Sequence, residues 1–408
     1  MTILGTSSIN EDEEVPARAV KVSHQRGSFV TPSYAVSVKD FCQGLVSREK
    51  LGGIVEVFIQ LKPEWLREMQ KDQKLLEKFE SRVNRYMKSI PDDQLVVTIP
   101  LIEGGQGFSF NENEALFAGA YIPELVTHSR VDIVCTPIFN RVAEKNVDVL
   151  TKKFLETMSS YSVGVSLSIP YFSRVILVRL ISIYMQMLSE NNRALPNFLC
   201  VDYNDSNPIS KYAFHNFVLG YLKSLQEEMS MSIVVYGANV KYSRVTKKYD
   251  EVAARDLASY FVQLDVFGGN HKRLLLPGEI SERLKAYESL WKQKLLNRER
   301  YTYVSLDMTE REPRLMVPEA QQIRELIENG STRREVEERI KSVVIGSILT
   351  ETKVLNLLFS GNGWRGFESP SEYLMSKEVM KMDEGILKKL KYFCNALGLK
   401  NRRLDEYT

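Results

Sequence analysis

Short apolar runs alternate with amphipathic segments along most of this chain. The runs are rich in valine, isoleucine and phenylalanine and have no polar face, which is typical of strands buried on both sides of a parallel sheet. They lie at residues 54–61, 95–101, 131–138, 163–169, 198–203, 233–236 and 260–267. Between them apolar residues recur at helical spacing, most clearly over residues 66–87. This alternation predicts a series of βα units.

Seven predicted strands need one more to close a barrel. Residues 30–37 would supply it as the first strand, and residues 301–307 would supply it as the last. Either choice predicts an α/β fold, a (β/α)8 TIM-like barrel, whose closure removes the exposed edges of a sheet. An open, doubly wound sheet is the alternative that the pattern leaves.

The two ends of the chain follow other patterns. Residues 1–16 are polar and acidic, which predicts a flexible tail. Alternation over residues 19–22, a turn at 25–27 and an extended run from Phe29 predict a β-hairpin. We therefore expect a barrel with its hairpin over residues 17–300 and a helical region over 301–408. Helices are predicted at residues 280–296, 319–328, 332–358 and 386–397.

Composition narrows the class of protein. The chain has 408 residues, of which 44% are hydrophobic, so it can bury a large core. The formal net charge of +2 restricts any nucleic-acid surface to a local patch. The lysine-rich face of the last predicted helix is one such patch, although such a face is often only solvated. Its lysines are Lys388, Lys389 and Lys391.

Cysteine spacing and hydropathy exclude further classes. The four cysteines form no CxxC pair, so we expect neither a zinc site nor a disulfide framework, and no cofactor. The longest apolar region, residues 163–188, is interrupted by Arg174 and Arg179, which argues against a membrane span. The acidic N-terminus does not resemble a signal peptide. These features predict a cytoplasmic protein.

Carboxylates follow several of the predicted strands. They are Glu103 after the run at 95–101, Asp202 and Asp205 at the end of the run at 198–203, and Asp265 in the last run. Because residues that follow parallel strands share one rim of a barrel, these acids are expected to lie near one another. Paired carboxylates suit acid–base or nucleophilic chemistry at a sugar carbon. Asp205, followed by a serine, an asparagine and a proline, suits a helix cap equally well.

Two polar loops accompany these acids. Gly104, Gly105 and Gln106 form a flexible loop after Glu103, without the spacing of a dinucleotide-binding or phosphate-binding motif. The basic trio at 271–273 ends the last predicted strand and would suit a phosphate. Its members are His271, Lys272 and Arg273.

The order of these segments resembles the tRNA-guanine transglycosylase superfamily, which includes enzymes that insert 7-deazaguanines into DNA. HQRGSFVTPSYAVS (24–37) looks like the family segment in which a threonine–proline pair leads into the first barrel strand. LVVTIPLIEGGQGFSF (95–110) is similar to its acid–glycine loop, and ASYFVQLDVFGGNHKR (258–273) to the strand that carries its nucleophile. IVEVFIQL, VDIVCTPIF and FLCVDYND occur in the matching order between them, so the likeness covers residues 18–273.

The resemblance implies the barrel that begins with residues 30–37 and an exchange of guanine for a 7-deazaguanine at C1′ of a nucleotide. In that reaction a carboxylate attacks the sugar, guanine leaves, and the incoming base displaces the enzyme. The family's nucleophilic aspartate falls at Gly268 of this chain, so that Asp265 is the nearest acid. The family's zinc ligands and base-recognition glycines have no counterpart.

These observations predict a transglycosylase-like protein acting on DNA or tRNA. Asp265 is the expected nucleophile, Glu103 the acid or base, and Asp202 the contact to the edge of the base. Asp205 and the two loops above are expected to bind the substrate, a nucleic acid with a 7-deazaguanine base. Two alternatives stay open: a non-catalytic nucleic-acid-binding subunit, in a homo- or hetero-oligomer, and an unrelated barrel enzyme for a small phosphorylated or sugar substrate.

Overall fold

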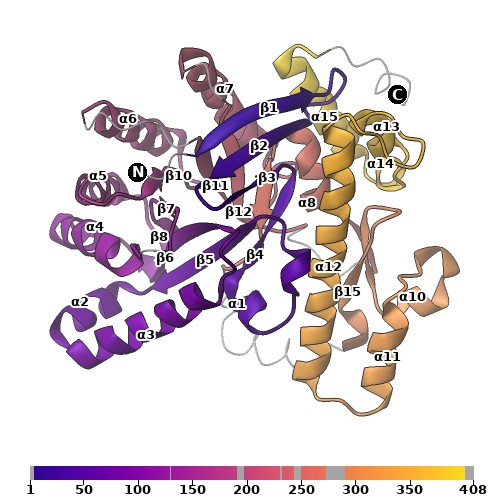
Figure 1. Ribbon diagram of the computed structural model, residues 1–408, viewed down its shortest axis with the longest axis horizontal. Coiled ribbons are helices and arrows are strands. Elements are labelled where there is room, and N and C mark those ends of the chain that lie inside the picture. The colour runs from indigo at the N-terminus through magenta and orange to yellow at the C-terminus, as the bar shows by residue number, and fades with distance from the viewer. Residues whose placement is uncertain are drawn as a thin grey trace.

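The computed structural model describes residues 4–128, 130–190, 197–229, 232–242, 250–272 and 290–399. At its centre is a nearly closed, barrel-like parallel sheet surrounded by helices (Figure 1). A mainly helical C-terminal region packs on one side of the barrel, where its long helix α12 (Arg333–Phe359) lies against β4 (Ser33–Ser37). The protein is thus an α/β barrel with a helical extension.

Ten strands in the described part of the chain make up the barrel sheet. Its order is β10-β11-β12-β14-β4-β5-β6-β7-β9, with β8 paired to β6, and every pairing is parallel. Besides β4, the strands are β5 (Ile54–Leu61), β6 (Leu95–Phe108), β7 (Ile133–Cys135), β8 (Ile138–Val142), β9 (Gly164–Ser166), β10 (Ser168–Ile169), β11 (Phe198–Ser206), β12 (Val234–Val240) and β14 (Val266–Gly268).

The strand pairings make the sheet nearly closed. β14 pairs with β4, so the last strand of the series meets the first. β9 and β10 are separated by Leu167 alone, and they pair with β7 and β11, respectively. An open doubly wound sheet is therefore wrong. Residues 33–37 belong to the barrel, whereas β16 (Thr302–Ser305), which the alternative placed in the barrel, lies in a separate antiparallel sheet with β13 (Glu251–Ala253) and β15 (Lys294–Asn297).

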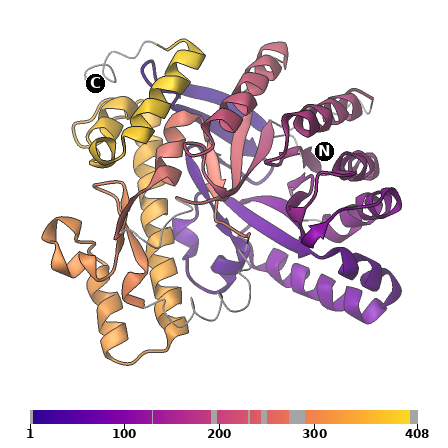
Figure 2. The ribbon, with the colours of Figure 1, turned by 180° about the vertical axis from the view of Figure 1, so that it is seen from behind.

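The core has two layers because strand side chains alternate between the two faces of the sheet. The inward layer contains Ile54, Val97, Cys200 and Val266. The outward layer packs against the helices that follow the strands, which fan around the barrel in Figures 1 and 2. These helices are α1 (Val38–Cys42), α2 (Pro63–Lys71), α3 (Gln73–Ser89), α4 (Glu112–Val126), α5 (Val147–Met158), α6 (Arg174–Glu190) and α7 (Tyr212–Met229).

The single helix predicted over residues 66–87 is two helices, α2 and α3. Asp72 lies between them in extended backbone, and its carboxylate accepts hydrogen bonds from the amides of Lys74 and Leu75. An aspartate that can satisfy the first amides of a new helix favours a break there. The helical periodicity was right, but the cap interrupts it.

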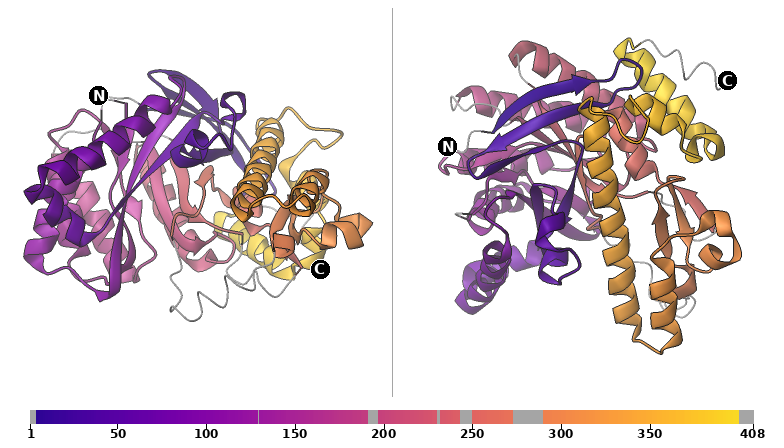
Figure 3. Two further views of the ribbon diagram at one scale, coloured as in Figure 1. Left: turned by 90° about the horizontal axis from the view of Figure 1, so that it is seen from below. Right: turned by 45° about the vertical axis from the view of Figure 1, so that its right-hand side comes forward.

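The N-terminal ribbon covers the amino end of the barrel. The predicted hairpin is confirmed as β2 (Arg18–His24) and β3 (Gly27–Val30). The prediction of a flexible tail over residues 1–16 is wrong, because β1 (Gly5–Glu11) pairs with β2. Val20, Val22 and Phe29 join the inward core layer. Figure 3 shows the ribbon lying across the barrel beside α12.

The prediction of a strand over residues 260–267 is largely wrong. Residues up to Val262 form the short helix α8 (Arg255–Ala258) and the 3-10 turn η2 (Ser259–Val262), and the strand begins at Val266. Tyr260, Phe261 and Val262 are all buried, and an apolar run buried on every side has the same pattern in a helix and in a strand.

The C-terminal region contains α10 (Met308–Arg311), α11 (Ala320–Glu328), α12, α13 (Pro370–Met375), α14 (Val379–Met382) and α15 (Glu384–Leu397), with short 3-10 turns η3 (Leu290–Lys292) and η4 (Pro313–Leu315). The predicted helices at 319–328, 332–358 and 386–397 are confirmed. The helix predicted over 280–296 fails at its described end, where η3 leads into β15, and its remainder lies outside the described residues. Because β13 pairs with β16, the expected boundary at residue 300 divides one small sheet.

Helix α12 is long and apolar enough to meet the composition criterion for a membrane span, but 61% of its most apolar window is buried inside the protein. It packs against β2, β4 and β15. These contacts are those of a helix that packs in the core of the protein.

Candidate functional site

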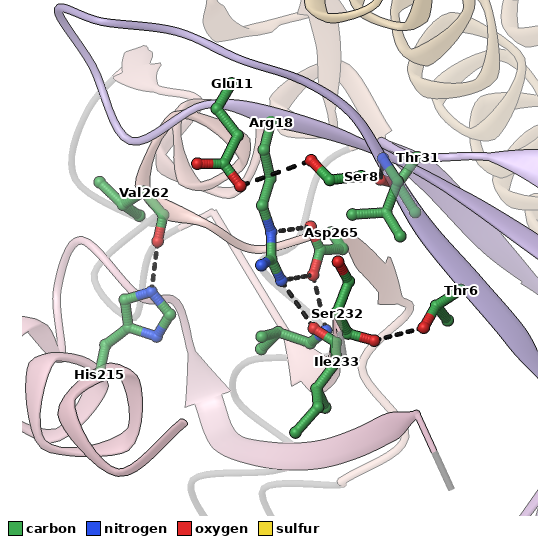
Figure 4. A network of polar contacts seen from close by, with 12 residues as sticks. Thr6, Ser8, Glu11, Arg18, Thr31, His215, Ser232, Ile233, Val262 and Asp265 are labelled. Carbon is green, nitrogen blue, oxygen red and sulfur yellow. Dashed lines mark hydrogen bonds and ion pairs between the residues drawn. The ribbon is translucent and has the colours of Figure 1, made fainter. Parts of the chain in front are cut away.

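Asp265 lies at the amino end of β14, beside the first residues of β12 and β4. Its amide donates to the carbonyl of Val235, and its own carbonyl accepts from the amide of Ser33. Arg18 of β2 holds the carboxylate in a bidentate pair, with Nε–Oδ1 at 2.9 Å and a second nitrogen 2.6 Å from Oδ2 (Figure 4). Both side chains are almost fully buried.

The amide of Val235 also donates to Oδ2 of Asp265 at 2.7 Å. This carboxylate is therefore saturated by a buried arginine and by the backbone, and it joins the N-terminal ribbon to the barrel. The prediction that Asp265 lies on the catalytic rim is wrong. Its physical reason is the late start of β14, which leaves Asp265 before the strand instead of after it.

A different acid, Glu56 of β5, points into the barrel, where its carboxylate lies against Gly268 at the end of β14. The side chain is completely buried. Its Oε1 accepts from Nε2 of His271 at 2.7 Å and from the amide of Gly269 at 3.2 Å. The hydroxyl of Tyr236 on β12 donates to Oε2. Burial, and then the neighbouring carboxylate, raise the pKa of Tyr236 well above its ordinary value, so the phenol stays protonated and donates.

Gly268 leaves the space that the Glu56 carboxylate fills. A Cβ at position 268 would overlap Oε2 of Glu56 and would lie 2.6 Å from the hydroxyl of Tyr236. A side chain at 268 and the carboxylate of Glu56 therefore exclude each other. Position 268 is also where the resemblance aligns the family's nucleophile.

His271 covers the Glu56 carboxylate from the solvent side. Its ring stacks on Phe58, with centroids 3.8 Å apart and planes at 20°. Its amide donates to Oδ1 of Asn239 at 3.0 Å. The imidazole is thus held by a ring, a carboxylate and a backbone contact, while its side chain keeps 21% exposure to solvent.

Lys272 spans the mouth from the loop after β14. Its Nζ lies 2.6 Å from Oδ2 of Asp202 on β11 and donates to the carbonyl of Phe139 on β8 at 2.7 Å and to Oδ1 of Asn204 at 3.1 Å. Asp202 also accepts from Nδ2 of Asn239 at 2.9 Å. Both charged groups are nearly inaccessible to solvent. This buried ion pair links three sectors of the barrel.

Asp205 belongs to the same cluster and does not cap a helix. Its Oδ1 accepts from Nδ2 of Asn270 at 2.6 Å and lies 3.3 Å from Nζ of Lys241. The turn into α7 is held instead by Asn207, whose Oδ1 accepts from the amide of Ser210. Asn204, Asp205 and Asn239 have positive φ angles of 50°, 59° and 53°, and strained backbone of this kind is concentrated at functional sites.

Glu103 lies in the adjacent sector, where β6 and β8 pair. It is half-buried and accepts a hydrogen bond from Gln60 of β5. The two residues line an open pocket of about 650 Å³ whose wall is completed by Lys62, Glu64, Trp65, Gly104, Gly105 and Arg141. The pocket offers an aromatic ring, two acids and two cations within reach of one ligand.

The predicted flexible loop after Glu103 is an extension of β6. Phe108 pairs with Val142 after an irregularity in the register that begins at Glu103. Gly104 is buried, and it leaves no room for a side chain, because a Cβ there would lie 2.6 Å from the carbonyl oxygen of Arg141. Gln106 is exposed and does not line the pocket.

The structure therefore divides the predicted site residues into groups. Asp202, Asp205, His271 and Lys272 gather in one network, Glu103 lines the neighbouring pocket with Gly104 and Gly105, and Asp265 lies elsewhere. Arg273 lies outside the described residues. Within those residues, no group of three or more histidine, cysteine, aspartate or glutamate side chains is arranged to hold a metal.

Sequence reasoning missed Glu56, Tyr236 and Asn239. The signal for Glu56 was an acid within an otherwise apolar strand, Ile54 to Phe58, since an acid is rarely buried without a partner. The chain matches no protein-family model and no curated protein sequence.

Proposed function

We propose that this protein is a transglycosylase-like barrel that exchanges guanine for a 7-deazaguanine in DNA or tRNA, with Glu56 as the carboxylate that acts at the sugar. The observation that carries the proposal is the mutual exclusion of Glu56 and a side chain at Gly268. The resemblance aligns the nucleophile at 268, and the carboxylate that takes up this space comes from β5 instead of β14. The proposed nucleophile is thus carried by a different strand, but its carboxylate occupies the space that a side chain at 268 would take.

The remaining residues have roles that follow from their contacts. An oxygen of Glu56 would form a bond to C1′ while the bond from C1′ to the guanine nitrogen breaks. Glu103, in the adjoining pocket, would give the leaving base its proton and recover one from the incoming base. Asp202 would contact the base edge, and Lys272 would turn from Asp202 to a phosphate when substrate enters.

His271 would leave the Glu56 carboxylate when substrate enters, because in its present position it covers the attacking oxygen. Gly268 and Gly269 lie shortly before His271 in the chain, and glycines tolerate backbone rotation.

We also propose that the sheet is a (β/α)8 barrel, in which β7 with β8, and β9 with β10, each count as one interrupted strand. A cytoplasmic location agrees with the free cysteines.

Exchange of labelled guanine from tRNA and from duplex DNA tests the proposal. Glu56→Gln should abolish exchange, because an amide is a far weaker nucleophile than a carboxylate. The sharper variant is the swap Glu56→Gly with Gly268→Asp, which moves the carboxylate back to β14 and should restore measurable exchange over Glu56→Gly alone. Full activity in Glu56→Gln, with wild-type folding shown by circular dichroism, would end the proposal.

A non-catalytic nucleic-acid-binding subunit is the second candidate, and one observation favours it. The Lys272–Asp202 pair and the contact of Lys272 with Phe139 close the mouth in this structure. If the wild-type chain shows no exchange, yet binds nucleic acid with an affinity that falls steeply with salt, this second function is correct. An affinity without salt dependence would favour the small-substrate barrel enzyme.

A further inference from the structure

A second surface on the carboxyl side of the barrel combines exposed tyrosines with cations. Tyr171 follows β10, Tyr212 begins α7, and Tyr392 lies on α15; they keep 41%, 39% and 43% of their surface exposed. We call this the tyrosine surface. Large aromatic side chains are usually buried, so three exposed rings in adjoining elements need a physical explanation.

The rings and cations of the tyrosine surface contact one another in pairs. The rings of Tyr392 and Tyr212 are 5.3 Å apart, and Nζ of Lys389 lies 5.5 Å from the Tyr212 ring. Lys211, next to Tyr212 in the chain, places its Nζ 3.5 Å from the centroid of Tyr171. Three elements distant in sequence therefore contribute to this surface, and α7 and α15, which are in contact, lie next to each other in Figure 2.

The tyrosine surface carries a local excess of positive charge. In the described part of the chain, Lys211 and Lys389 take part in no ion pair, nor does the exposed Arg174, which begins α6 three residues after Tyr171. The carboxylate beside Arg174 is that of Glu144, which accepts hydrogen bonds from Ser173. The carboxylates at the start of α15 are occupied, Asp383 by Arg255 at 2.6 Å and Glu384 by Lys388 at 3.4 Å. Since the whole chain has a net charge of only +2, this excess is a local feature.

We infer that the tyrosine surface binds single-stranded nucleic acid. Unstacked bases present flat faces to tyrosine rings, and the phosphates between them are attracted to the lysines and the arginine. A duplex hides its base faces, so the rings favour a single strand. Its position on the carboxyl side of the barrel would lead such a strand to the mouth, and this last step alone rests on the proposed function.

Fluorescence anisotropy with a short labelled single strand and its duplex tests the inference directly. The wild-type chain should prefer the single strand. The triple variant Tyr171→Ala, Tyr212→Ala, Tyr392→Ala should weaken this binding by about tenfold or more, because each removed ring loses its stacking contact with a base. Leu116→Ala with Met316→Ala, two exposed apolar residues elsewhere, is the matched control and should leave binding unchanged.

Salt dependence tests the cations separately. Lys211→Gln, Lys389→Gln and Arg174→Gln together should reduce the slope of log affinity against log salt by about 2, since each phosphate contact on a single strand contributes about 0.7. The control removes Lys74, Lys78 and Arg85 from the exposed side of α3 and should leave the slope unchanged.

The inference is wrong if the wild-type chain binds no single strand, or if the control variants weaken binding as much as the tyrosine variants. A tyrosine variant that alters only self-association in sedimentation would also overturn it. These experiments distinguish failure of the tyrosine surface from failure of the proposed function. Strand binding without base exchange supports the tyrosine surface and rejects the proposed function, whereas exchange with unaltered strand binding in the tyrosine variants rejects the surface alone.

Discussion

The two ends of the barrel hold their buried charges in different ways. At the amino end, the Arg18–Asp265 pair is bidentate, sealed beneath the N-terminal ribbon and complemented by backbone groups. Toward the carboxyl end, Glu56 and Asp202 pair with His271 and Lys272 of the segment that follows β14. Positive φ angles accompany the second set.

This difference separates charges that are held fixed from charges that a ligand could displace. An ion pair that joins two rigid sheets resists rearrangement, because moving either partner leaves a buried charge unpaired. A pair whose cation lies on a glycine-preceded loop can open when another anion, such as a phosphate, replaces the carboxylate. Burial alone therefore does not identify an active site, and the mobility of the partner is the better criterion.

The largest expected effect is on the amino end. Asp265→Asn should reduce the free energy of unfolding by about 3–5 kcal/mol, because Arg18 stays buried without its counter-charge. Urea unfolding measures this change. Glu338→Gln removes an exposed helical pair with Arg334 and should cost less than about 0.5 kcal/mol. Equal losses in the two variants would contradict the structural role of the Arg18–Asp265 pair.

Low pH should lower the free energy of unfolding through His215 of α7. This side chain is fully buried between the Tyr203 hydroxyl and the carbonyl of Val262, and burial lowers its pKa to about 4. Below pH 6.5 the unfolded chain gains a proton that the folded chain does not, so stability is lost as the pH falls from about 6.5 to 4. The loss at pH 4 should approach roughly 3 kcal/mol.

His215→Gln keeps a donor for the Val262 carbonyl and does not titrate in this range. Urea unfolding at a series of pH values should therefore show a flatter profile for the variant than for the wild-type chain. A profile that keeps its full slope would assign the acid sensitivity to other groups.

At the mouth, Gly268→Ala should destabilise the protein by about 1–3 kcal/mol, because the new methyl group meets Glu56 and Tyr236. Gly269→Ala is the matched control, since a Cβ at position 269 would lie at an ordinary contact distance of 3.4 Å from the Tyr34 hydroxyl. Thermal unfolding measures both. Combining Gly268→Ala with Glu56→Gly should recover most of the loss, and additive losses would contradict the shared space.

The smallest expected effect on stability is that of Glu103→Gln. The side chain is half-exposed and contacts Gln60, so the change should be below about 0.5 kcal/mol. If Glu103 moves the proton in base exchange, the same variant should slow exchange by roughly 10²-fold or more. A normal rate would remove Glu103 from the mechanism while leaving the role of Glu56 intact.

The local pattern determined which segments are strands and helices, and it did so best where one face was polar. The hairpin at 18–30 followed its alternation. Residues 260–267 did not, because side chains buried on all sides carry no periodicity. The lysines of α15 were visible as a basic face, but their proximity to Tyr212 was not.

What the sequence by itself determined was the succession of βα units and the presence of acids and basic residues near the ends of the strands. Only the tertiary structure decided which acid belongs to the mouth. Asp265 and Glu56 are both acids next to apolar residues, but they lie at different places in the barrel. Strand β14 starts after Asp265, which leaves this acid at the amino end. The pleat of β5 turns Glu56 inward, toward Gly268. A shift of a few residues in a strand boundary moves a side chain from one end of a barrel toward the other, and that boundary depends on packing between distant segments.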